Sequence, residues 1–149
     1  MILNITLGFI IPWIFGVRLY FKEKKAILIV VPFMSMCAYF LSEILFHLKL
    51  FALAPLQITD DYTTMSLNVG LYPLLAAYLI YFINLNKLPR YMLFIIFAFV
   101  PTMAEYLGLV FKIVTYDNGW NLGWTFLSYI IYYLIGYWYY NKVEKYWRD

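Results

Sequence analysis

The chain has 149 residues, of which 65% are hydrophobic and only 13% are charged, with a mean hydropathy of +0.76. Soluble domains are about half apolar and a quarter charged, so this composition excludes an ordinary soluble enzyme or nucleic-acid-binding domain and indicates an integral membrane protein. The net charge of +3 comes from basic residues between and after the apolar segments, where the anionic membrane surface is the expected partner. We expect a single transmembrane domain over residues 1–149 and no binding to nucleic acid.

Five apolar segments are each long enough to cross a bilayer as a helix. They cover residues 2–21, 26–46, 63–83, 91–110 and 123–140. Between the second and third, Phe51–Leu56 is apolar but too short to span, so we expect it to lie at the interface or to dip back. The run Tyr116–Asn121 (YDNGWN) predicts a turn centred on Asn118 and Gly119. The predicted fold is an all-α bundle of five transmembrane helices.

The basic residues predict the orientation of this bundle, because cytoplasmic loops are enriched in Lys and Arg. Only Lys49 and Lys112 fall on one side, so we expect that side to be outside the cell. The other basic residues fall on the opposite, cytoplasmic side: Arg18, Lys22, Lys24, Lys25, Lys87, Arg90, Lys142, Lys145 and Arg148. The N-terminus is then outside, the C-terminus is cytoplasmic, and the first apolar segment is an uncleaved span. We expect a multi-pass protein of the bacterial cytoplasmic membrane.

Two further patterns concern helix shape and the membrane interface. Internal prolines tend to kink helices, which either reflects ordinary packing or opens a central cavity. The sequence places them at Pro12, Pro32, Pro73 and Pro101. Tyrosines cover nearly all faces of the last apolar segment, and with Trp138 we expect them to form the cytoplasmic aromatic belt.

Glu105 is the main candidate for a functional residue. It lies within an apolar run, and a charge at membrane depth is costly, so such residues usually serve a function. The second span also contains an acid, Glu43, and His47 follows it by one helical turn on the same face. Asp61, Trp120 and Asn121 belong to connectors on the same outer side. These residues define a predicted ligand- or ion-binding site in the outer half of the bilayer.

Helical spacing suggests how such a site would be built. Residues 97, 101, 105, 108 and 112 form one stripe on the fourth span, and residues 32, 36, 39, 43 and 47 form another on the second. If both stripes face inward, two carboxylates, an imidazole and an ammonium group meet in one outward-facing pocket. The alternative is that these are interfacial groups that are hydrogen-bonded or extend toward water.

Three kinds of chemistry are compatible with these residues. Carboxylates and an imidazole suit a metal such as zinc, iron or manganese, although one histidine without a closely spaced ligand motif predicts no metal site. A proton or cation relay needs only an intramembrane carboxylate, a condition that Glu105 meets. An acid–base enzyme acting on a lipid would use two carboxylates. The sequence has no nucleophile constellation, phosphate loop or dinucleotide motif, so we expect neither a cofactor nor, on balance, an enzyme.

The C-terminal half resembles a known family. The residues of the likeness are Asp61, Tyr72-Pro73-Leu74-Leu75, Pro101, Glu105-Tyr106, Trp120-Asn121 and Trp124, within residues 61–140. They are similar to a functionally uncharacterised family of small polytopic membrane proteins from spore-forming Gram-positive bacteria. The resemblance implies a membrane location and fold, and it supports a role for Glu105, Trp120 and Asn121, but it implies no activity.

Together these patterns favour a protein that binds or passes a small ligand or ion at an outward-facing polar pocket around Glu105. The first alternative is an accessory or structural protein that packs against a larger membrane partner or forms a homo-oligomer. The second is a membrane enzyme acting on a lipid or isoprenoid. In every case the lipid bilayer is the surrounding partner.

Overall fold

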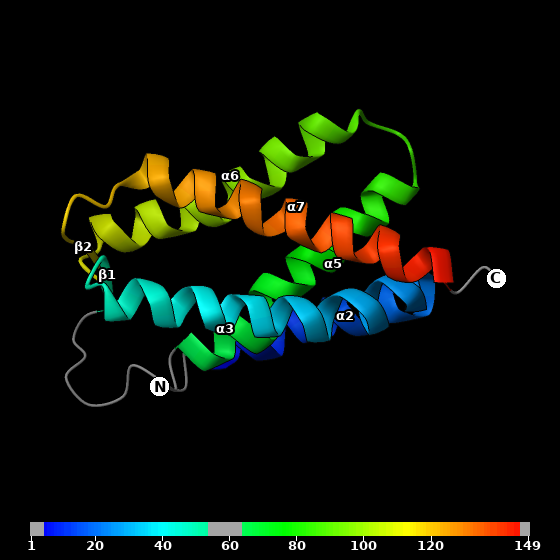
Figure 1. Ribbon diagram of the computed structural model, residues 1–149. Coiled ribbons are helices and arrows are strands. Elements are labelled where there is room, and N and C mark those ends of the chain that lie inside the picture. Colours follow the sequence, from blue (N-terminus) through cyan, green and yellow to red (C-terminus); the bar gives the residue numbers. More distant parts are fainter. Residues whose placement is uncertain (1–4, 54–63, 147–149) are drawn as a thin grey trace.

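A computed structural model of the chain describes residues 5–53, with the backbone alone for 51–53, and residues 64–146. Helices make up nearly all of this part of the chain (Figure 1), so the all-α class is confirmed. The helical elements are η1 (Thr6–Ile10), α2 (Ile11–Lys22), η2 (Ala26–Val30), α3 (Val31–His47), η3 (Leu67–Leu71), α5 (Tyr72–Asn84), α6 (Arg90–Val110) and α7 (Leu122–Tyr146). Two short strands, β1 (Phe51–Leu53) and β2 (Val114–Tyr116), complete the fold.

Within the described residues, three helical segments are long and apolar enough to cross a membrane. They are Ala26–His47, Thr64–Asn84 and Arg90–Val110, which lie within a few residues of the second, third and fourth predicted segments. Large apolar side chains also point outward from the bundle, among them Phe40, Phe99 and Ile131, which are 68%, 53% and 50% exposed. Helices of this length with such an apolar surface indicate a membrane protein.

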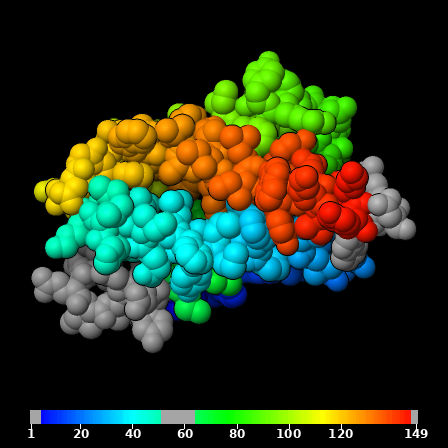
Figure 2. Space-filling view, in the orientation of Figure 1, coloured from blue at the N-terminus to red at the C-terminus, as the bar shows by residue number. Residues whose placement is uncertain are grey.

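The helices run back and forth between two ends of the molecule (Figure 1). The turns from α2 to α3 and from α5 to α6 lie at one end, together with the C-terminal end of α7. The ends of α3 and α6, the start of α7 and the two strands lie at the other. We call the end with the strands the ribbon end. Along one face, α3 and α7 lie side by side (Figure 2).

Three of the four internal prolines follow a π-helical turn. Each of η1, η2 and η3 is continued directly by an α-helix whose second residue is a proline: Pro12, Pro32 and Pro73. A proline has no N–H and its ring displaces the carbonyl four residues earlier, which a wider turn accommodates. The Ile11 N–H accordingly donates to the Thr6 carbonyl, and the Tyr72 N–H donates to that of Leu67, five residues back. Pro101 lies inside α6.

The first and third helical segments touch backbone to backbone. A Cβ added to Gly70 of η3 would lie 2.0 Å from the carbonyl oxygen of Gly8 in η1 and 2.8 Å from Cα of Phe9. Small residues permit this kind of close crossing between membrane helices. Asn68, which belongs to the candidate site described below, lies two residues before Gly70 in η3. The crossing therefore holds the backbone close to this site in place.

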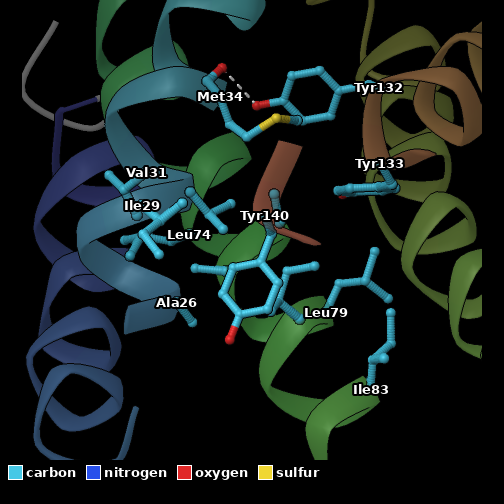
Figure 3. Packing of buried hydrophobic residues seen from close by; sticks show 14 of the residues in the cluster. Ala26, Ile29, Val31, Met34, Leu74, Leu79, Ile83, Tyr132, Tyr133 and Tyr140 are labelled. Atoms are coloured by element: carbon cyan, nitrogen blue, oxygen red, sulfur yellow. Dashed lines mark hydrogen bonds between the residues drawn. The ribbon is translucent and has the colours of Figure 1, made fainter. Parts of the chain in front are cut away.

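Four tyrosines of α7 form part of the core, so the prediction of a cytoplasmic aromatic belt is wrong for these four. Tyr129, Tyr132, Tyr133 and Tyr140 are all less than 10% exposed. Tyr132 donates a hydrogen bond of 2.9 Å to the backbone carbonyl of Met34 in α3 (Figure 3). These side chains are buried because they lie on the faces of α7 that pack against α3, α5 and α6. Trp138 does face outward.

The two strands connect the helix ends at the ribbon end. They pair antiparallel, with Phe51 opposite Tyr116 and Leu53 opposite Val114. Phe51–Leu53 thus belongs to a strand pair, while the rest of the predicted interfacial stretch, 54–56, lies outside the described residues. The predicted turn is confirmed: Asn118 and Gly119 have φ angles of 49° and 81°, and the Trp120 N–H donates to the Asp117 carbonyl at 2.9 Å.

Candidate functional site

Glu105 lies on α6, one helical turn after Pro101, and its carboxylate is held by two tyrosines. The Tyr129 hydroxyl of α7 donates to Oε1. The Tyr116 hydroxyl of β2 donates to Oε2 at 2.6 Å. These short O–H to carboxylate bonds are charge-assisted and stronger than those between neutral groups. Three successive elements of the chain therefore converge on this one side chain.

A second layer of hydrogen bonds supports Tyr116. The Thr125 hydroxyl donates to the Tyr116 oxygen at 2.9 Å, and the Trp120 indole N–H donates to the Thr125 oxygen at 2.9 Å. Every bond in this chain of donors points toward Glu105, so each polarises the next. Burial raises the pKa of Tyr116, and the neighbouring Glu105 carboxylate raises it further. Tyr116 therefore remains a neutral donor at physiological pH.

The Glu105 network forms part of the wall of a cavity at the ribbon end of the bundle, with a volume of about 60 Å³. This volume accommodates a few water molecules or a small polar group. One side of the wall is apolar and comes mainly from α3, with Ala38, Leu41 and Leu45. The other residues of the wall are Ser42, Phe46, Thr64, Leu67, Asn68, Tyr72, Glu105, Trp120, Thr125, Ser128, Tyr129 and Tyr132. The cavity is thus largely apolar with polar groups at fixed positions, as is common for small-molecule sites.

Asn68 places an unused hydrogen-bond donor in the same wall. Its side chain is only 1% exposed, and its Oδ1 accepts a bond of 3.1 Å from the hydroxyl of Ser42 in α3. Its Nδ2 has no hydrogen-bond partner among the described residues. A buried donor without a partner is costly, so such groups are rare in native structures. The cavity therefore has a free donor on η3 as well as the carboxylate on α6.

Only some of the residues predicted for the site line the cavity. Glu105 and Trp120 line the cavity. Asn121 is exposed, and its Oδ1 accepts from the backbone N–H groups of Gly123 and Trp124, so it caps the first turn of α7. Asp61 lies outside the described residues.

Glu43 and His47 are both exposed on α3 and do not line the cavity. The condition that both stripes face inward is therefore not met on α3, where Glu43 and His47 face outward as the alternative describes. The face of α3 that is turned to the bundle has Met34, Ala38 and Ser42 instead. Ala38 and Ser42 are small, which allows this part of α3 to pack closely against η3 and α7. On α6 the stripe from Phe97 to Gly108 does face inward at least in part.

Sequence reasoning missed several groups of this site. Tyr116, Thr125 and Tyr129 give no signal of their own, because hydroxyl-bearing residues are frequent throughout the second half of the chain. Asn68 did give a signal: it is a strongly polar residue inside a predicted span. Among the residues that the structure describes, no group of three His, Cys, Asp or Glu side chains is arranged to hold a metal ion.

Comparisons with models of protein families, with curated proteins and with solved structures find no match for this chain.

Proposed function

We propose that the chain crosses the bacterial cytoplasmic membrane five times, with the N-terminus outside and the C-terminus in the cytoplasm. The antiparallel course of the helices supports five crossings (Figure 1). The two turns at the end opposite the ribbon end contain Lys22, Lys24, Lys25 and Lys87, and α7 ends there with Lys145. Lysines and arginines favour the cytoplasmic side. In this orientation the ribbon end, and with it the cavity, lies in the outer half of the protein.

We further propose that the protein binds or passes a small ligand or ion in this cavity without catalysing a reaction on it. The observation that supports this function best is the Glu105 carboxylate, fixed by two tyrosine hydroxyls in the cavity wall. An ionised carboxylate has about four sites for hydrogen-bond donors. A donor or a cation in the cavity would reach the sites that remain, and would offset the cost of keeping a charge in an apolar helix.

The enzyme alternative has less support from the geometry. A lipid-processing mechanism with two carboxylates needs both within reach of one reacting centre. Among the described residues that line the cavity, Glu105 is the one carboxylate, and Glu43 lies on the outward face of α3.

The accessory-protein alternative predicts a dedicated contact surface, but the exposed apolar side chains occur on several helices, as contact with lipid requires.

Native mass spectrometry of the detergent-purified protein tests the proposed function. Wild type should retain a discrete ligand, ion or lipid, and Glu105→Gln should lose it, because the amide cannot provide the negative charge. Glu43→Gln is the matched control, since it makes the same change at an exposed position, and it should retain the adduct. Identical adducts on all three proteins, or none on any of them, would contradict a ligand site at Glu105.

A further inference from the structure

We propose that the ligand is a lipid-soluble molecule that places a free hydroxyl group in the cavity. This inference rests on the ligand site proposed above and adds the chemical class of its occupant. It follows from two groups in one wall: the partly buried Glu105 on α6, whose carboxylate can accept further hydrogen bonds, and the buried Asn68 on η3, whose Nδ2 has no partner among the described residues.

The two groups differ in what they need. The Glu105 carboxylate only accepts hydrogen bonds, so a ligand must offer it a donor. The Asn68 Nδ2 only donates, and it has no partner among the described residues, so a ligand must offer it an acceptor. The Ser42 hydroxyl already donates to Oδ1 of Asn68. This bond orients the amide and leaves its N–H group available to a ligand. One occupant therefore satisfies both sides only if it both donates and accepts.

A hydroxyl group is a small neutral group with this property, which it shares with water. A protonated amine donates to the carboxylate but offers nothing to Asn68. A carbonyl or ether oxygen satisfies Asn68 but not Glu105. A phosphate brings negative charge toward Glu105, and no Lys, Arg or His is among the described residues that line the cavity.

The size and lining of the cavity indicate the rest of the molecule. A volume of about 60 Å³ holds little more than a hydroxymethyl group and its neighbours. Leu41, Leu45 and Leu67 give this space an apolar wall, which favours a carbon chain over a sugar. In the proposed membrane orientation, the remainder of the ligand stays in the bilayer. Both a straight-chain alcohol and a glycerolipid with a free hydroxyl provide this chemistry.

Binding of paired ligands to the wild-type protein tests the proposal without depending on whether a variant folds. The probes are dioctanoylglycerol, its acetylated derivative, its phosphorylated derivative and dodecan-1-ol. The protein is kept in an amine-oxide detergent, because maltoside detergents carry hydroxyls that would compete. We expect dioctanoylglycerol to bind at least about tenfold more tightly than the acetylated and phosphorylated forms, since the acetyl group offers Glu105 no donor and the phosphate brings negative charge toward it. Binding of dodecan-1-ol as tight as that of dioctanoylglycerol would indicate a simple alcohol, and weaker binding would indicate a glycerolipid.

Variants locate the hydroxyl within the cavity. Asn68→Asp keeps the size of the side chain and its acceptor for Ser42 but removes the free donor, so dioctanoylglycerol should bind about tenfold more weakly, while its preference over the acetylated form, which depends on Glu105, should persist. Glu43→Gln, at an exposed position outside the cavity, is the control and should keep both the affinity and that preference. Equal binding of the three glycerol derivatives to wild type, or no binding of any probe, would overturn the hydroxyl class. If a native adduct is still lost in Glu105→Gln, the proposed function stands with another ligand; if not, it fails as well.

Discussion

Replacing Gly70 by alanine should destabilise the protein more than the same replacement at any buried helical glycine that faces a flexible side chain. The new Cβ would lie 2.0 Å from the Gly8 carbonyl oxygen and 2.8 Å from Cα of Phe9. Atoms in van der Waals contact are about 3.5 Å apart or more, so η1 and η3 must separate by roughly 1 Å or more. Both contacts are with backbone atoms, which no rotamer change relieves. The cost is at the upper end of that for overpacking, about 3 kcal/mol.

Gly136→Ala is the matched control. Its Cβ would meet Sδ and Cε of Met34 at 2.8 and 3.1 Å, and a methionine side chain moves aside easily. Both substitutions gain the same helix propensity, so their difference isolates the backbone clash. For a chain of this size each kcal/mol shifts the melting temperature by about 2–4 °C. Thermal unfolding in detergent should therefore place Gly70→Ala about 6–12 °C below wild type and clearly below Gly136→Ala. Equal melting temperatures for the two variants would refute the proposed backbone crossing.

Three further predictions concern buried hydroxyls, the carboxylate and the orientation. Tyr132→Phe should lower stability by about 1–2 kcal/mol because it frees a buried carbonyl, whereas Tyr133→Phe should be neutral or stabilising because that hydroxyl has no partner among the described residues. Thermal unfolding of the two variants measures the difference. Glu105→Gln should cost about 1–3 kcal/mol, since an amide nitrogen cannot accept from a tyrosine hydroxyl; its denaturation midpoint in detergent is the readout. A cysteine at Asn118 in a Cys37→Ser background should react with an impermeant thiol reagent on intact cells.

Each of these predictions has a clear contrary result. A larger loss of stability for Tyr133→Phe than for Tyr132→Phe would mean that the hydrogen bonds of α7 are assigned incorrectly. Unchanged stability of Glu105→Gln would mean that the two tyrosines do not depend on the carboxylate. A cysteine at Lys87 is the topological control and should react only after the cells are lysed; if it reacts on intact cells while Asn118→Cys does not, the proposed orientation is reversed.

The helices of this protein could be predicted from the sequence because apolar runs of sufficient length have few alternatives to a helix in a membrane. The ends of α6 were also predictable from the limits of its apolar run. The turn at Asn118 and Gly119 was predictable because a positive φ angle favours these two residue types. Glu105 stood out as a charge in an apolar run. These features depend on local sequence alone.

The inward face of α3 could not be predicted in the same way. In a soluble protein the polar side marks the surface, but a membrane helix is apolar on both sides. Glu43 and His47 therefore suggested a pocket, whereas Ala38 and Ser42 face the bundle because small side chains permit close packing. The partners of Glu105 depend on how α7 and β2 meet α6, and this tertiary geometry leaves no periodic trace in the sequence.

The order of the Glu105 contacts along the chain has a consequence for biosynthesis. Tyr116 and Tyr129, which hold the carboxylate, both follow it in the sequence. When α6 is synthesised, neither donor has yet been made, so the acid precedes in the chain the groups that satisfy it. A nascent chain stalled after α6 would expose this unsatisfied acid, and only the arrival of α7 completes its surroundings. The last helix therefore completes the surroundings of the carboxylate, and a chain that lacks it leaves the acid without the Tyr129 donor.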